Sequence, residues 1–247
     1  DIVTGIEKAK KDENGEEIKP WTREHIETAL KRLMAQTFNE MTAVRPEDID
    51  GWTYNGNNDI RGLLLLMNVE TYKQTKYQRF PFHSYIKEEW DIEHIDSFHT
   101  NALKKDDLKK EWITTAFEDR KNYLSEEEKT TIESKMENKD YDSVIDLLKK
   151  NAGETEVDED IKNGIGNLTL LDSETNRSYG NSLFCTKRRI IIDRIKQGVF
   201  VPVATQYIFS KFYDEKGTNR SVWAKEDMEA YQKYIVKMLS EYLPENN

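Results

Sequence analysis

Cysteine and long apolar segments are scarce in this chain of 247 residues. The single cysteine, Cys185, excludes an internal disulfide framework and a zinc site built from Cys-x-x-Cys pairs. Any metal site must therefore use oxygen and imidazole ligands. The longest apolar run, at residues 63–67, is far shorter than the roughly 18 residues of a membrane-spanning helix. We therefore expect no membrane anchor.

Positive charge is also in deficit. The chain has 37 Lys and Arg residues against 47 Asp and Glu residues, which gives a formal net charge of -10. Such a surface repels nucleic acid on average, so any contact with nucleic acid must come from a local basic patch. The opening segment is too polar to be a secretory signal and does not start with Met. We expect a cytoplasmic protein whose chain is a fragment of a longer one.

The residues that are present can build a packed core, because 36% are apolar and 11% aromatic. Apolar spacing predicts an amphipathic helix over 21–38, with Thr22 as its N-cap, and a buried helix over 61–74. Alternating residues predict a short strand at 91–96, and NLTLL predicts a second at 167–171. Further helices are predicted within 101–165, from about 182, at 207–212 and at 228–243. We predict an α+β chain that is mostly helical.

Glu93 and His94 are adjacent in the first predicted strand, and asparagines follow in and after the second. Hydrolysis of a phosphodiester bond needs a base that deprotonates water, a cation that neutralises the phosphate oxygens, and a fixed geometry. Histidine is a suitable base near neutral pH, and carboxylate and amide oxygens suit Mg²⁺. The pattern indicates metal-dependent cleavage of nucleic acid. The same Glu-His-Ile triplet at 24–26 lacks such a partner segment, and we interpret it as structural.

Two segments carry a resemblance to a known family. DIEHI at 91–95 and GNLTLLDSETNRSYGN at 166–181 resemble the ββα-metal fold of HNH endonucleases. More narrowly, WDIEHID, GNLTLL, GNSLF and KRR are similar to the C-terminal nuclease domain of GmrSD-type, modification-dependent (type IV) restriction enzymes. The upstream stretches NVETYKQ and RFPFHSYIKEEW also resemble that architecture, so the resemblance covers roughly residues 60–200.

The resemblance implies a role for each matching residue. His94 would be the general base, Glu93 a metal ligand, Asn167 in the second strand the residue that orients the base, and Asn176 the residue that completes the metal site. The implied cofactor is Mg²⁺, with Mn²⁺ or another divalent cation as alternatives. Two residues depart from the usual family pattern. Asn176 stands where the last letter of the name HNH expects His, and Glu93 stands where many members have Asp. Asn and Glu can both bind Mg²⁺ through oxygen.

Strand geometry constrains this metal site. Adjacent residues of an ideal strand point to opposite faces, so Glu93 and His94 are predicted to lie at a strand end or bulge. Without that bend, Asp91 or Asp96 is the better ligand candidate. Asn181 is either an additional ligand or the N-cap of the next helix. Lys187 and Arg188, on the helix that follows, are predicted to contact phosphate groups.

The predicted organisation is a helical N-terminal region at 1–88 and an HNH nuclease domain at 89–247, with a helical insertion at 101–165 and C-terminal helices. The resemblance implies DNA as the substrate, including modified phage DNA, and a role in restriction and antiviral defence. It also implies an N-terminal nucleotide-hydrolysing domain or subunit that this chain lacks. A homodimer is an open alternative. Two other functions also stay open, which are a non-catalytic module that binds nucleic acid or a partner, and an RNA-directed nuclease toxin.

Overall fold

The computed structural model describes residues 22–40, 51–54, 60–75, 79–96, 103–155, 157–175, 181–213 and 221–243. These residues are mostly helical, and their two strands form one antiparallel sheet. The predicted α+β class with mostly helical content is confirmed for this part of the chain. Asn176 lies outside the described residues.

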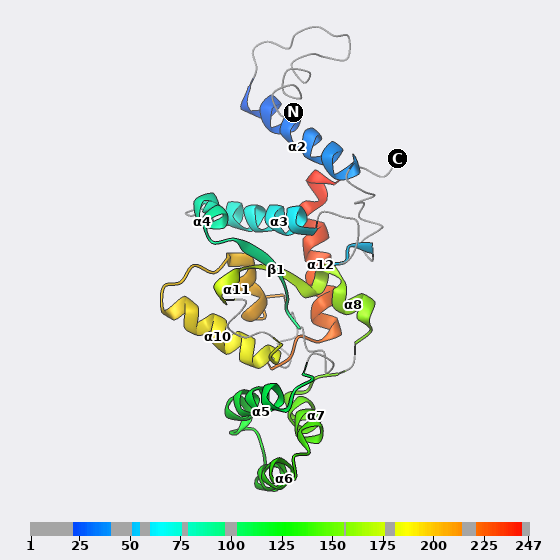
Figure 1. Ribbon diagram of the computed structural model, residues 1–247. Helices are drawn as coiled ribbons and strands as arrows, with labels where there is room; N and C mark the ends of the chain where they lie inside the picture. Colours follow the sequence, from blue (N-terminus) through cyan, green and yellow to red (C-terminus); the bar gives the residue numbers. More distant parts are fainter. Residues whose placement is uncertain are drawn as a thin grey trace.

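The helices and strands follow the predicted order (Figure 1). The first part contains α2 (Arg23–Glu40), α3 (Ile60–Gln74), α4 (Phe82–Lys87) and β1 (Trp90–His94). The predicted insertion contains α5 (Asp106–Arg120), α6 (Glu126–Glu137), α7 (Tyr141–Ala152), α8 (Glu159–Asn163) and the 3-10 turn η3 (Ile165–Asn167). The last part contains β2 (Leu168–Asp172), α10 (Phe184–Lys196), α11 (Val203–Phe209), α12 (Lys225–Leu239) and the 3-10 turn η4 (Ser240–Tyr242).

The small sheet depends on the helices around it. β1 and β2 pair in a regular antiparallel register, with Glu93 opposite Thr169 and His94 opposite Leu168. A two-stranded sheet is at best marginally stable in water. Here α3 and α11 pack against β2, and all five residues of β2 are buried. The strand that carries the histidine is therefore fixed by a core to which distant parts of the chain contribute.

The main hydrophobic core joins the N-terminal and C-terminal helices. Leu63, Leu64 and Met67 of α3 are completely buried and belong to the same cluster as the buried residues of β2, α10, α11 and α12. The helix α12 packs against both α3 and η3. The predicted buried helix over 61–74 is thus confirmed, and its apolar run is buried in this core except for Leu65, which is partly buried.

The helices α5, α6 and α7 have a hydrophobic core of their own (Figure 1, green, bottom). Ile113, Val144, Ile145 and Leu148 are among its buried residues. The turn before α6 forms a capping box, in which Ser125 accepts the backbone N–H of Glu128 and the Glu128 carboxylate accepts the backbone N–H of Ser125. The predicted helices of the insertion are confirmed. They pack around a second hydrophobic core.

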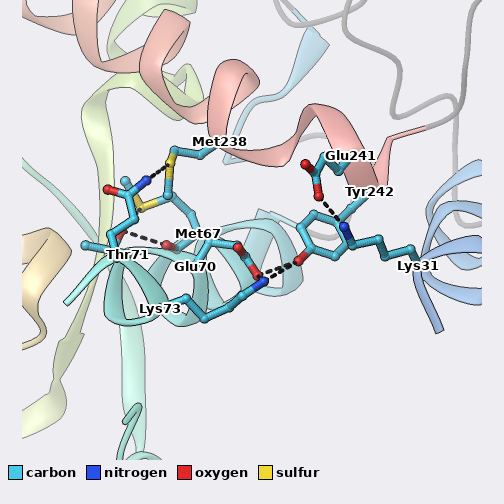
Figure 2. A network of polar contacts seen from close by, with 9 residues as sticks. Lys31, Met67, Glu70, Thr71, Lys73, Met238, Glu241 and Tyr242 are labelled. Atoms are coloured by element: carbon cyan, nitrogen blue, oxygen red, sulfur yellow. Dashed lines mark hydrogen bonds and ion pairs between the residues drawn. The ribbon is translucent and has the colours of Figure 1, made fainter. Parts of the chain in front are cut away.

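A polar network connects α2, α3 and η4 (Figure 2). The Tyr242 hydroxyl donates to the Glu70 carboxylate, and Lys73 Nζ lies 2.8 Å from Glu70 Oε1 and 3.0 Å from Tyr242 Oη. Lys31 of α2 forms an ion pair with Glu241 of η4. These contacts hold α2 against η4.

The N-terminus of α2 and the break before α4 also follow the sequence. The backbone N–H of His25 donates to Thr22 Oγ1 at 3.3 Å, which confirms Thr22 as the N-cap. Pro81 immediately precedes α4, as expected for a residue that cannot continue a helix. Among the described helices, none is long and apolar enough to cross a membrane.

Two asparagines lie elsewhere than predicted. Asn167 is the last residue of η3, one position before β2, because its side chain turns back toward the preceding backbone instead of joining the strand. Asn181 is not the N-cap of α10, since that position is Leu183, which makes no side-chain cap hydrogen bond. Leu183 is completely buried in the second core, so burial of an apolar side chain decides this helix start.

Gly166 allows η3 to approach α12 closely. A Cβ atom at this position would lie 2.9 Å from the Met228 carbonyl carbon, closer still to the Met228 carbonyl oxygen, and 3.1 Å from Gln232 Cβ. The Gly166 carbonyl also accepts the indole N–H of Trp223 at 3.2 Å. Because the obstacle is helix backbone, a side chain at Gly166 could fit only if η3 or α12 moved.

We therefore predict that Gly166→Ala lowers the free energy of unfolding by about 2 to 4 kcal/mol, as overpacking against a rigid neighbour does. Gly51→Ala is the control, because a Cβ at Gly51 has no atom within 4 Å, and its effect should stay within about 0.5 kcal/mol. Urea unfolding followed by circular dichroism measures both. Equal stability of the two variants would contradict the close approach.

Candidate active site

Asn167 fixes the bend that follows His94. Its side-chain Nδ2 donates to the carbonyls of Asp96 and Lys162, both at 2.8 Å, and its Oδ1 accepts the backbone N–H of Asp96 at 2.8 Å. Its backbone carbonyl accepts the N–H of Ile95 at 2.8 Å. Asn167 is completely buried. The chain after β1 is therefore tied to Asn167 by three hydrogen bonds, and the fourth ties Asn167 to α8.

His94 is the last residue of β1, and residues 95 and 96 form a bend. The predicted position at a strand end is thus confirmed, in a register without a bulge. His94 Nε2 lies 3.2 Å from Asn163 Oδ1, and the ring centroid lies 5.0 Å from that of Tyr54. Because an amide oxygen only accepts, this contact places the hydrogen on Nε2 and leaves the lone pair on Nδ1 when the ring is neutral.

The Glu93 carboxylate points to a different neighbour. Lys187 Nζ of α10 donates to Glu93 Oε1 at 2.7 Å and to the carbonyl of His94 at 2.7 Å. The Lys187 side chain is completely buried, and 12% of the Glu93 side chain is exposed. Burial lowers the pKa of Lys187, and the Glu93 carboxylate opposes this shift. One ammonium group thus holds both residues of the Glu-His pair.

The expected contact of Lys187 with phosphate is not compatible with this position. A wholly buried ammonium group that already binds a carboxylate does not face a ligand at the surface. The helical spacing of α10 explains the difference, because Lys187 shares its buried face with Phe184 and Ile191, at three and four residues away. The neighbouring Arg188 is half-buried, and its Nε has no hydrogen-bond partner among the described residues.

The other predicted residues lie apart from this group. Asp91 is exposed and lies 3.4 Å from the guanidinium of Arg61. The backbone carbonyl of Asn181 accepts the indole N–H of Trp112 at 2.9 Å, which connects the start of α10 to α5. Within the described residues no group of three His, Cys, Asp or Glu side chains could hold a metal ion. Asn176, which the resemblance implies as the residue that completes the metal site, lies outside the described part of the chain.

Three residues at this site have no signal in the sequence. Asn163 and Lys162 are at the end of the short helix α8, where Asn163 contacts His94 and Lys162 Nζ lies 3.7 Å from the buried carboxylate of Asp96. Tyr54 comes from a segment before α3. Two backbone contacts bring the segment of Tyr54 to the end of α8. Thr53 forms a β-bridge with Gly164, and the backbone N–H of Tyr54 donates to the Asn163 carbonyl at 2.8 Å.

Glu154 is a further buried carboxyl group near the bend. Burial raises its pKa to about 7, and the Asp96 carboxylate adds to this shift, whereas Lys162 and Lys149 oppose it. Its Oε1 has no hydrogen-bond partner among the described residues. The burial of this carboxyl group cannot be recognised from the sequence. Nothing in the pattern separates it from the exposed Asp158 and Glu159.

Residues 102–238 match the model of the C-terminal domain of GmrSD restriction endonucleases. The match covers more than half of the 247 residues, so the chain belongs to this family of restriction endonuclease domains. The resemblance seen in the sequence is thereby confirmed. The matched segment contains Asn167 and Lys187 but begins after Glu93 and His94.

Neither the curated proteins nor the solved structures contain a match to this chain.

We predict that Glu93 and Lys187 are strongly coupled in stability. Lys187→Met leaves the Glu93 carboxylate buried without its cation and should cost about 3 to 5 kcal/mol. The double variant Glu93→Gln with Lys187→Met should recover about 1 to 3 kcal/mol of the summed single effects. A double-mutant cycle by urea unfolding measures the coupling.

The control is the pair Glu126 and Lys129, which has the same 2.7 Å distance but lies on the surface of α6, with side chains 89% and 30% exposed. Its coupling should stay below about 0.5 kcal/mol. If both cycles gave the same small value, the buried ion pair would not be present in solution.

A second prediction concerns pH. The Glu154 carboxyl has a pKa near 4.5 when it is fully solvated and about 7 in the folded chain, so the folded state binds its proton more tightly. Its contribution to stability is complete below about pH 4.5 and is lost as the pH rises through 7. Glu154→Gln should therefore match the original protein near pH 4.5 and exceed its free energy of unfolding by about 3 kcal/mol at pH 8.

Urea unfolding at several pH values measures this difference. Glu159→Gln, an exposed change on the adjacent α8, should leave the pH dependence of stability as it is. A constant difference between Glu154→Gln and the original protein across this range would show that Glu154 is solvated.

Proposed function

We propose that this chain is a metal-dependent HNH endonuclease that hydrolyses phosphodiester bonds in DNA. The observation that carries the proposal is the position of His94 at a strand end, with Asn167 bonded to the bend behind it and Glu93 directly before it. The antiparallel strands β1 and β2 and the following helix α10, which contacts β1 through Lys187, are the parts that a ββα-metal unit requires.

His94 is the general base of this mechanism. With Nε2 bonded to Asn163, Nδ1 is the nitrogen that accepts the proton from the attacking water. Asn163 fixes the ring by contact, and Asn167 fixes the backbone that follows His94. A base held from two directions loses little freedom when the substrate binds, which favours the reaction.

Glu93 and Asn176 would hold the divalent cation. Mg²⁺ keeps several water ligands and needs few protein oxygens, so a carboxylate and an amide oxygen fit it. Lys187 donates a hydrogen bond to one of the two Glu93 carboxylate oxygens. When bound, Mg²⁺ or Mn²⁺ would neutralise the negative charge that develops on the phosphate oxygens. Asp91 and Asn181 stay additional candidates for this ligand set.

DNA is the proposed substrate because the family consists of restriction endonucleases. Restriction of phage DNA, including modified DNA, is the cellular role that we propose. An N-terminal nucleotide-hydrolysing domain or subunit would act with this nuclease domain, and a dimer would place two sites on opposite strands. Arg188 remains the proposed phosphate contact on α10. The proposed nuclease domain starts near residue 89, although α3 shares its core.

The test is cleavage of plasmid DNA with Mg²⁺, Mn²⁺ or a chelator. His94→Ala should reduce the cleavage rate by about 10²- to 10⁴-fold, the usual effect of removing a general base, while circular dichroism shows a folded protein. His25→Ala is the control, since His25 is an exposed residue of α2 in the same Glu-His-Ile triplet, and it should retain full activity.

Full activity of His94→Ala would exclude the mechanism. Activity that persists with a chelator would exclude the metal. RNA offered in parallel decides the substrate, because cleavage of RNA but not DNA would replace the restriction role by that of an RNA-directed nuclease.

A further inference from the structure

Tyr54 is an exposed aromatic residue next to the proposed base. Its ring centroid lies 5.0 Å from that of His94, with the two planes inclined by 59°. Tyr54 is 47% exposed, and His94 beside it is half-buried. The Tyr54 ring therefore lies at the surface of the protein beside His94, where a substrate can approach it.

The backbone of Tyr54 is fixed even though its ring is exposed. The carbonyl of Trp52 accepts the N–H of Ile165 at 2.8 Å, Thr53 bridges Gly164, and the N–H of Tyr54 donates to the Asn163 carbonyl at 2.8 Å. Trp52 is 1% exposed and belongs to the main hydrophobic core. The segment Trp52–Tyr54 is thus anchored beside η3 by both hydrogen bonds and packing.

Asn163 connects the His94 ring to the backbone of Tyr54. Its side chain contacts His94 Nε2, and its backbone carbonyl holds the N–H of Tyr54. A shift of Tyr54 would therefore act on the same residue that fixes the base. The stability of the core does not require this arrangement, because the Tyr54 ring itself is outside the core.

We propose that Tyr54 binds the apolar face of the nucleoside next to the phosphate that is cut. This inference rests on the proposed nuclease function and names a contact for its substrate. Neighbouring nucleotides of one strand are about 3.4 Å apart along a duplex, so a phosphate at His94 brings a sugar and base within reach of a ring 5.0 Å away. A rigid aromatic side chain loses little conformational entropy on binding.

This contact also fits the charge of the chain. With a net charge of -10 and Lys187 buried, ionic attraction to DNA is weak on average. A contact between an aromatic ring and a nucleoside gains affinity without positive charge. Tyr54 would thus position the cut strand at a site that has few cations to hold it.

The experiment measures DNA binding in a protein that cannot cleave. In the His94→Ala background, a fluorescently labelled short duplex and its single strand are titrated with Tyr54→Ala, Tyr54→Phe and the unchanged background in the presence of Mg²⁺. Tyr54→Ala should weaken binding by about tenfold, in the range of one lost aromatic contact to a base, and Tyr54→Phe should stay within about twofold. The salt dependence of binding should not change, because no phosphate contact is lost.

Tyr123→Ala is the matched control, because Tyr123 is 68% exposed in the turn after α5 and should bind as the background does. Unchanged binding of Tyr54→Ala would overturn the inference, and an equal loss for Tyr54→Phe would assign the effect to the hydroxyl and overturn it too. A larger loss for the single strand than for the duplex supports contact with an unpaired base, and an equal loss supports contact with the sugar.

The cleavage rate distinguishes a wrong role of Tyr54 from a wrong nuclease function. If the protein with His94 intact cleaves DNA but Tyr54→Ala does so at the same rate, only the role of Tyr54 is lost. If the original protein does not cleave any nucleic acid, the nuclease function itself is lost.

Discussion

The candidate site depends on one buried side chain, that of Asn167. A carboxamide has two donor hydrogens and one acceptor oxygen, and here all three are directed to backbone groups on two other segments. Neither a carboxylate nor an aliphatic side chain of similar size could make these bonds, and buried backbone groups without partners are costly. The bend after His94 and the end of α8 are thereby held in one arrangement, although they are distant in the sequence.

The buried pair of Glu93 and Lys187 has a different character. A buried ion pair is seldom more stable than an apolar pair of equal volume, because both charges lose their hydration. Stability alone therefore does not explain it. The ammonium group also binds the carbonyl of His94, so the pair fixes the direction of Glu93 relative to the proposed base. In the proposed function, this orientation would direct the Glu93 carboxylate toward the divalent cation.

The sequence predicted the fold better than it predicted the surroundings of the site. The helices at 61–74 and 101–165 and both strands follow from apolar periodicity, which reports burial along one element. Lys187 was misjudged because a charged residue on a helix is ordinarily solvated, and only tertiary contact with Glu93 shows otherwise. Asn163, Glu154 and Tyr54 carry no local pattern, and their roles arise from segments that meet only in the folded chain.

The helices α5, α6, α7 and α8 lie between the two strands of the sheet in the sequence. The insertion packs mainly within itself through α5, α6 and α7, so its length adds little strain to the sheet. Its last part, α8, is the exception, because Lys162 and Asn163 return to meet Asp96 and His94. The part of the insertion nearest β2 thus contacts the candidate site, whereas α6 packs against α7. The contacts of α8 with His94 and of Asn167 with the bend therefore hold the end of β1 beside the start of β2, although many residues separate them in the sequence.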